Sequence, residues 1–100
     1  MDSKKEESKS DLSLDDHKAH VDEVGYVYIE GSVTNNTNEN YPYVEIEFGL
    51  YDEDNAFVGA AIDNTTDLEA GGTWKFKAVS FCDIDSADKY ALINLRGMKI

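Results

Sequence analysis

The chain is poor in cysteine, proline and basic residues, and each scarcity excludes a class of protein. Cys82 is the single cysteine among 100 residues, so no internal disulfide and no cysteine–histidine zinc cluster can form. The histidines, His17 and His20, lie near the other end of the sequence, a pattern that disfavours a catalytic thiol. Cys82 is therefore expected to be a small buried apolar residue on a strand.

Basic residues are outnumbered by acidic ones, 9 to 21, which gives a formal net charge of −12. Phosphate recognition needs clustered lysine and arginine, and no such cluster is present, which argues against nucleic acid as a partner. Anionic membrane surfaces are disfavoured for the same reason. No apolar run approaches the ~18 residues of a membrane span, so direct insertion of this domain is not expected. The acidic excess is expected chiefly to keep the domain soluble.

One hundred residues, 41 % of them hydrophobic, fit one domain with one modest core. Residues 1–14 contain no aromatic or β-branched residue and are rich in serine, lysine and acids, so they predict a flexible polar leader or tether. The folded domain is expected over residues 15–100. The start at Met1 shows no export signal and fits either a native terminus or a methionine that replaces a removed export segment.

Apolar residues alternate along several short segments, which is the pattern of half-buried strands. Residues 26–34 and 43–51 carry the clearest alternation. The inward positions that it predicts are Val27, Ile29, Gly31, Val33, Val44, Ile46, Phe48 and Leu50. Further strands are expected at residues 17–24, 56–63 and 73–81 and at the C-terminal end, joined by turns and by a connection over residues 63–74.

No segment shows a helical apolar stripe with caps. Six or seven short strands with turn signals between them predict an all-β fold, an immunoglobulin- or fibronectin-like antiparallel β-sandwich of about seven strands. The asparagine-rich loop at residues 35–42 would then cross between the two sheets.

Three short motifs resemble one known family. Residues 48–52 read Phe-Gly-Leu-Tyr-Asp, residues 31–37 read Gly-Ser-Val-Thr-Asn-Asn-Thr, and residues 68–76 read Leu-Glu-Ala-Gly-Gly-Thr-Trp-Lys-Phe. Their order and content are similar to those of the FxLYD domain family. The resemblance implies an immunoglobulin-like sandwich without enzymatic activity, carried outside the membrane by an exported bacterial protein that is often a lipoprotein or membrane-tethered. The chain departs from that pattern because it shows no export signal or lipid-attachment cysteine.

The residues of the F-x-L-Y-D motif also have a structural interpretation of their own. Phe48 and Leu50 share the inward face and are expected to pack in the core. Tyr51 points to the other face. Asp52 ends the strand, where its carboxylate is expected to accept backbone N–H groups and close a hairpin turn.

Two acidic loops raise the possibility of a calcium site. Asp83, Asp85 and Asp88 occupy positions one, three and six of a loop, and alternate carboxylates can converge on a hard cation. An EF-hand is excluded because glycine at position six and glutamate at position twelve are missing. A looser site shared with the loop Asp52–Asn55 stays open beside the simpler alternative of solvated acidic turns.

Four tyrosines form a second candidate. Tyr26 and Tyr28 share the outer face of one predicted strand, and Tyr43 and Tyr51 share that of another. Exposed aromatic side chains can bind protein, glycan or peptidoglycan. The sequence is compatible with the two strands lying in one sheet or in two different sheets, and only the first arrangement could join the four tyrosines in one patch. Tyrosine is also common on half-buried strand faces.

These observations predict a non-catalytic binding or structural module of a bacterial surface or secreted protein. We expect it to be extracellular, membrane-tethered in the full-length protein, monomeric and without a cofactor, with a protein or glycan as partner. The alternative is a calcium-dependent binding module that uses the acidic loops. A small exported enzyme or inhibitor is a third interpretation. An enzyme is disfavoured because it needs catalytic groups that converge in a pocket, whereas the paired carboxylates lie on turns without a nearby histidine.

Overall fold

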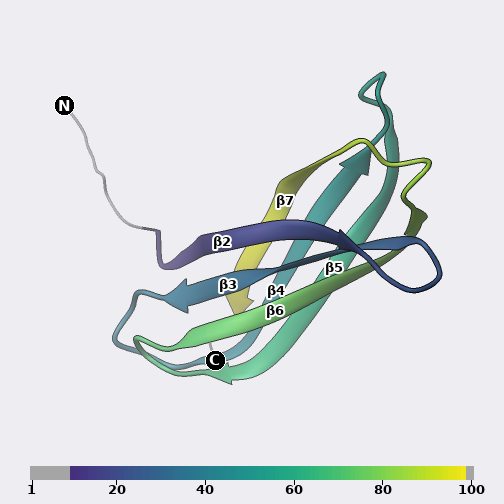
Figure 1. Ribbon diagram of the computed structural model, residues 1–100. Coiled ribbons are helices and arrows are strands. Elements are labelled where there is room, and N and C mark those ends of the chain that lie inside the picture. Colours follow the sequence, from purple (N-terminus) through teal and green to yellow (C-terminus); the bar gives the residue numbers. More distant parts are fainter. Residues whose placement is uncertain (1–9, 99–100) are drawn as a thin grey trace.

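Six strands make up most of residues 10–98, the part of the chain that this computed structural model describes. They are β2 (Leu12–Val21), β3 (Tyr26–Asn35), β4 (Tyr41–Tyr51), β5 (Phe57–Leu68), β6 (Thr73–Asp83) and β7 (Lys89–Met98). All neighbouring strands are antiparallel, and their order in the sheet is β2-β3-β6-β5-β4-β7 (Figure 1). The described residues contain no helix long and apolar enough to cross a membrane.

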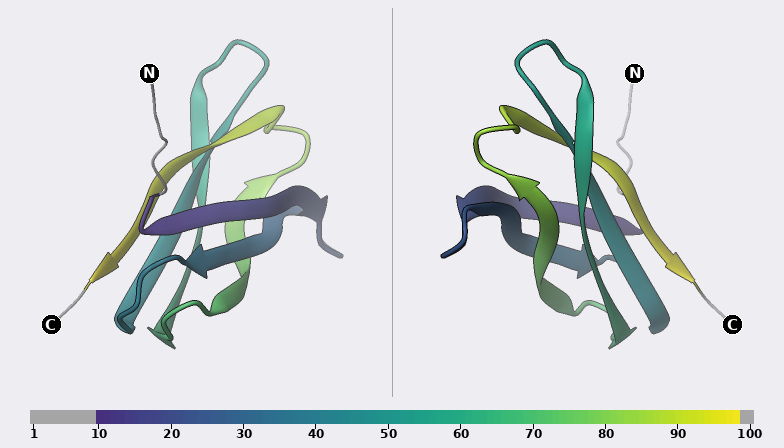
Figure 2. Two further views of the ribbon diagram at one scale, coloured as in Figure 1. Left: turned by 90° about the vertical axis from the view of Figure 1, so that its left-hand side faces the viewer. Right: turned by 90° about the vertical axis from the view of Figure 1, so that its right-hand side faces the viewer.

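The predicted all-β antiparallel architecture is confirmed, but hydrogen bonds join the six strands of residues 10–98 in one sheet, where a sandwich of about seven strands was expected. The reason is β5, which pairs with β4 along its length and also with β6, where Ile62 lies opposite Val79. The sheet curls into a half-barrel, so that β2 and β3 cross over β4 and β7 (Figures 1 and 2). Its concave side encloses the core.

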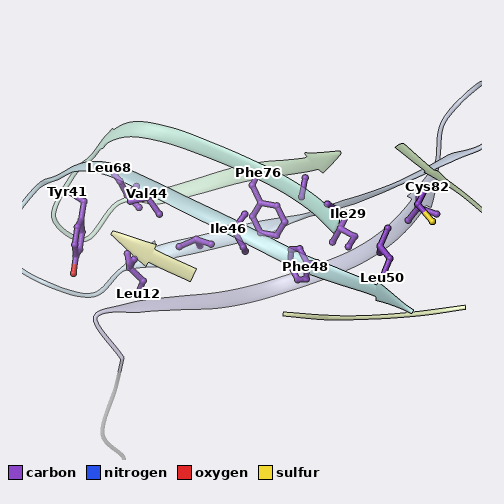
Figure 3. Packing of buried hydrophobic residues seen from close by; sticks show 14 residues of the cluster. Leu12, Ile29, Tyr41, Val44, Ile46, Phe48, Leu50, Leu68, Phe76 and Cys82 are labelled. Carbon is purple, nitrogen blue, oxygen red and sulfur yellow. The ribbon is translucent and has the colours of Figure 1, made fainter. Parts of the chain in front are cut away.

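The core lies between the two curled halves of the sheet, and the alternation in β3 and β4 correctly identified half of its residues (Figure 3). The seven large apolar side chains predicted to point inward from these strands are at most 4 % exposed. Each such side chain stabilises the fold by about 1.5–3 kcal/mol. Phe48 of β4 meets Phe76 of β6 with ring centroids 5.7 Å apart, and Trp74 packs on Phe76 at 5.8 Å.

The first strand begins earlier than the polar composition indicated. β2 starts at Leu12, whose side chain is 8 % exposed, so residues 12–14 belong to the sheet and not to the predicted leader. The physical reason is that Leu12 and Leu14 occupy inward positions and pack on the core. Of the rest of that leader, residues 10 and 11 are exposed and precede the strand, and residues 1–9 lie outside the described range. The strand also ends earlier than expected, at Val21, and residues 22–25 form a turn.

The strand β5 is longer than predicted. It was expected to end at residue 63, but it continues to Leu68, with Thr65 and Thr66 opposite Val44 and Tyr43. Polar side chains are compatible with this strand because only part of it faces the core, as its mostly exposed pattern shows. The connection to β6 is therefore a short turn around Gly71, which has a positive φ of 74°.

Gly31 marks a close approach between β3 and β2. A Cβ atom at this residue would overlap the Asp16 carbonyl oxygen and would also lie 2.7 Å from the Phe76 ring. The register of β2 shifts between Leu14 and His17, which indicates a bulge at this point. Glycine is needed because the bulged backbone and an aromatic ring fill the space of a side chain.

Candidate functional site

The two acidic loops meet at one end of the sheet. The backbone N–H of Asp88 donates to the Tyr51 carbonyl at 2.7 Å, which joins the β6–β7 loop to the end of β4. Between the loops lies an open concavity of about 610 Å³, which we call the acidic basin. Its acidic lining residues are Asp52, Glu53, Asp54, Asp85 and Asp88. The loops are therefore neighbours, as a shared calcium site would require, but Asp83 does not line the basin.

Two of these candidate ligands are engaged by their own turns. One carboxylate oxygen of Asp52 accepts the N–H groups of Asp54 and Ala56, both at 2.9 Å, which confirms its predicted role in closing the hairpin. Asp83 likewise accepts the N–H of Ser86 at 3.0 Å. Within residues 10–98, no group of three or more histidine, cysteine and acidic side chains is arranged to hold a metal ion. The geometry therefore favours solvated turns at this end.

Cys82 lies in the core, as expected. Its side chain is buried, and burial together with the charge of Asp83 raises the pKa of the thiol above its ordinary value. His17 contacts Tyr90, and His20 stacks on Tyr28 and lies 3.3 Å from Glu30. Burial and a neighbouring negative charge both make a thiol a poor nucleophile.

The four tyrosines do not form one surface. Tyr26 and Tyr28 lie on β3, Tyr43 and Tyr51 lie on β4, and β6 and β5 separate these strands in the sheet. Tyr43 donates a hydrogen bond to Glu45 at 3.0 Å. The Tyr51 ring packs against Phe57 with centroids 5.9 Å apart. Only the pair on β3 belongs to a larger aromatic and apolar surface.

That surface runs across the convex side of the sheet. His20, Tyr28, Val79 and Ile62 lie directly opposite one another on β2, β3, β6 and β5, and opposite residues share a face. Beside this row, Tyr26 and Phe81 meet edge to face with centroids 6.1 Å apart. We call the apolar members of this surface the outer patch: they are Tyr26, Tyr28, Ile62, Val79 and Phe81.

The outer patch is open to solvent. Phe81 is 90 % exposed, and Ile62 and Val79 are about half exposed. Scattered exposed apolar residues are ordinary on proteins, whereas a contiguous group across several strands is typical of an interaction site. Val79 and Phe81 lie on the outer face of β6, where exposed and buried residues alternate. Sequence reasoning missed the patch because the pairing of Ile62 with Val79 depends on a register that no local pattern reveals.

Basic side chains border the outer patch. Lys77 Nζ lies 4.6 Å from the centroid of the Tyr28 ring. Lys18 and Lys77 both lie opposite Glu30, and Lys75 lies opposite Ser32, on the same face. These three lysines are most of the basic residues in the described range, which are Lys18, Lys75, Lys77, Lys89 and Arg96. The convex side of β2, β3 and β6 therefore carries three lysines, with Glu30 between two of them, whereas the lining of the acidic basin contains no basic residue.

Comparison of the chain with protein-family models, with curated proteins and with solved structures found no match. A functional assignment therefore depends on the geometry described above and on the motifs of the sequence.

Proposed function

We propose that the chain is a non-catalytic binding module and that the outer patch is its contact surface. The observation that carries the proposal is Phe81, a phenylalanine 90 % exposed in edge-to-face contact with Tyr26 beside a cross-strand apolar row. Large aromatic side chains on a rigid sheet lose little conformational entropy on binding and are common energetic centres of interfaces. The bordering lysines favour a partner that presents carboxylate groups beside an apolar area.

The partner is proposed to be a protein or a glycan at a bacterial cell surface. This part of the proposal rests on the resemblance to the FxLYD family in residues 31–37, 48–52 and 68–76. The curled sheet supports an immunoglobulin-like relationship, because β2, β3 and β6 face β4, β5 and β7 across one core, as the two sheets of a sandwich do. An extracellular, membrane-tethered protein would present the convex side of such a domain to its surroundings.

The proposal is tested with labelled protein on two probes, purified peptidoglycan sacculi and an array of acidic glycans. Phe81→Ser removes the most exposed ring of the patch, and binding should weaken about thirtyfold, the effect of losing an energetic centre of an interface. Val24→Ser is the matched control, because Val24 is 73 % exposed in the β2–β3 turn and is not part of the patch. Equal binding of the two variants, or no binding of the parent chain to either probe, would count against the outer patch as a contact surface for these ligands.

A calcium-dependent module is the second candidate. It is favoured by one observation, the meeting of the two acidic loops around the acidic basin. Such a module would need the loops to rearrange, since Asp52 and Asp83 already accept backbone N–H groups. The two candidates differ in their response to calcium, because only the second needs a bound cation to function.

A further inference from the structure

The strand β7 forms one margin of the sheet and has a free edge. It pairs only with β4, and within residues 10–98 no strand is hydrogen-bonded to its other side, which β2 approaches at Tyr90. In an antiparallel sheet, alternate residues of an edge strand direct their N–H and C=O groups away from the paired side. The outer edge of β7 therefore presents backbone donors and acceptors that can pair with one further strand, in two runs separated by the bulge at Ile93.

The centre of this edge is apolar. Residues 90–95 read Tyr-Ala-Leu-Ile-Asn-Leu and carry no charge, in a chain of which 30 % is charged. Leu92 lies opposite Phe48, a core residue, yet it is 41 % exposed. Ile93, at the irregularity in the β4–β7 register, is 48 % exposed. An added strand would cover apolar surface as well as satisfy backbone groups.

The opposite margin of the same sheet is built differently. The free edge of β2 carries Asp15, Asp16 and Lys18, and its register shifts between Leu14 and His17. Charged side chains and bulges are the usual means by which proteins prevent unwanted strand pairing. β7 also has a bulge, but its centre lacks charge. The sheet thus protects one edge with charges and leaves the centre of the other edge apolar.

Charges at the end of β7 indicate what the added strand carries. Arg96 binds Glu45 through Nε at 3.0 Å, while its side chain is 61 % exposed. The terminal guanidinium nitrogens have no partner among residues 10–98 and can bind a carboxylate from outside. Lys89 lies at the other end of the strand. A matching strand has an apolar centre and an acidic residue where it passes Arg96.

We propose that the outer edge of β7 binds an extended segment of another polypeptide by antiparallel strand addition. Backbone hydrogen bonds along β7 supply affinity, apolar side chains on alternate positions of the segment cover Leu92, and an acidic residue near its N-terminal end pairs with Arg96. The site is separate from the outer patch and does not depend on the function proposed for it. A second copy of this chain would bring its own net charge of −12 to the interface and would be repelled. A short segment with one acidic residue brings much less like charge.

The probe is a synthetic peptide of about eight residues, a typical strand length, with an acidic N-terminal residue followed by alternating valine and threonine. It is titrated into the isotope-labelled full chain, and backbone amide signals are followed by NMR. Signals of β7 should shift, and its amides should exchange with solvent about tenfold more slowly when the peptide is bound. The control peptide has the same side chains but N-methyl groups on alternate residues, which remove the donors that face β7.

Two protein variants complete the test. Leu92→Lys places a charge at the centre of the edge and should weaken peptide binding about tenfold or more. Val21→Lys makes the matched change on β2, where Val21 is 45 % exposed, and should leave binding unchanged. The comparison of the two peptides on the parent chain needs no variant, so it remains decisive if either variant fails to fold.

Three results would overturn the proposal. The first is equal binding of the N-methylated peptide, or no shift of β7 signals at about 1 mM peptide, a concentration that detects even weak binding. The second is shifts confined to β2 or to the outer patch. The third is a dimer of the parent chain, detected by sedimentation equilibrium without peptide and dissociated by Leu92→Lys, which would assign the edge to a second copy.

Discussion

The Nδ1 atom of His17 on β2 lies 2.8 Å from the Oη atom of Tyr90 on β7, although these strands are the opposite margins of the sheet. Both rings also contact Phe48, with centroids 6.1 and 5.7 Å from it. The curl of the sheet thus brings its two margins together over a core phenylalanine. One hydrogen bond and one direct ring contact, between His17 and Tyr90 with centroids 5.6 Å apart, connect strands that share no backbone pairing.

Removing the hydroxyl of Tyr90 should destabilise the domain. Tyr90→Phe keeps the ring on Phe48 and deletes the hydrogen bond, which is worth about 1 kcal/mol. For a domain of this size, the melting temperature should fall by about 4–8 °C. In a His17→Ala background the same change should have little further effect, because its partner is already gone. Additive losses in this double-mutant cycle would show that the two side chains are not coupled.

Substitution of Asn35 should lower the stability of the domain more than substitution at most other positions of the chain. Its side chain is fully buried; Nδ2 donates to the carbonyl oxygens of Glu39, Leu68 and Glu69, and Oδ1 accepts from Thr37.

Asn35→Ala would remove these hydrogen bonds, including the buried one to the Leu68 carbonyl, and should cost about 3 kcal/mol or more in the free energy of unfolding. Asn35→Asp should be no milder, because an ionised carboxylate cannot donate. Asn36→Ala is the matched control at the next, exposed position and should cost about 1 kcal/mol or less. Urea unfolding measures all three, and equal losses at both positions would contradict the assigned hydrogen bonds.

The same substitution should have different effects at two strand glycines. Gly31→Ala places a methyl group against the Asp16 backbone and should cost about 1–3 kcal/mol or more, because backbone cannot move aside easily. At Gly49 the atoms nearest to an added Cβ belong to the Tyr51 ring, with Oη at 2.5 Å, and that flexible side chain can move more easily than backbone. Gly49→Ala is therefore expected to lose less stability. If thermal melts show that Gly49→Ala is the more destabilising variant, the backbone contact at Gly31 is not the more severe of the two.

The stability of the domain should depend on pH through Glu45. A hydrogen bond from Tyr43, with further ones from Asn94 and Arg96, lowers the pKa of this carboxyl below its ordinary value of 4.5, although burial acts in the opposite direction. A lowered pKa in the folded state means that Glu45 stabilises the fold above its ordinary pKa. This stabilisation is lost as pH falls through the lowered value.

Glu45→Gln should therefore destabilise the domain at neutral pH, and the difference from the parent chain should shrink as the pH falls below 4.5. Urea unfolding across this range measures the effect. Glu47→Gln removes the same charge from the same face of β4, outside this hydrogen-bond cluster, and serves as the control. A difference for Glu45→Gln that stays constant with pH would contradict the assigned cause.

Calcium should leave the melting temperature unchanged. Asp52 and Asp83 close their own turns, and the described residues present no ready metal cluster. A calcium-dependent module would behave differently: binding at 100 times its dissociation constant adds about 2.7 kcal/mol, which corresponds to a rise of roughly 10–20 °C. Melts with millimolar calcium and with EDTA at matched ionic strength separate these outcomes. A clear rise would favour the calcium-dependent module over the proposed function.

Local patterns predicted the parts of the fold that depend on one strand at a time. Alternation identified Ile29, Ile46 and Phe48 as core residues because a half-buried strand needs an apolar side chain at every second position. The hydrogen bonds of Asp52 were likewise predictable from turn chemistry. Leu12 was missed because the serine, lysine and acid around it are typical of a flexible leader.

Relations between strands were not predictable in the same way. The pairing of β5 with both β4 and β6 joins the halves of the sheet, and it depends on twist and register that alternation does not encode. The outer patch depends on the same pairing, since Ile62 reaches Val79 only through it. The separation of Tyr28 from Tyr43 likewise follows from strand order and not from either strand alone.

The strand order also has a kinetic consequence. β4 and β5 are joined by a short hairpin that closes with few residues between its strands, whereas β3 pairs with β6, so that Ile29 lies opposite Ala78. Pairing of distant segments must first offset the entropy of closing a long loop, which makes folding slow. The β4–β5 hairpin is therefore expected to form early, and the pairing of β3 with β6 is expected to limit the folding rate. Until that step, the apolar edge of β7 is accessible on a chain whose core is incomplete, so the domain is most prone to aggregation during folding.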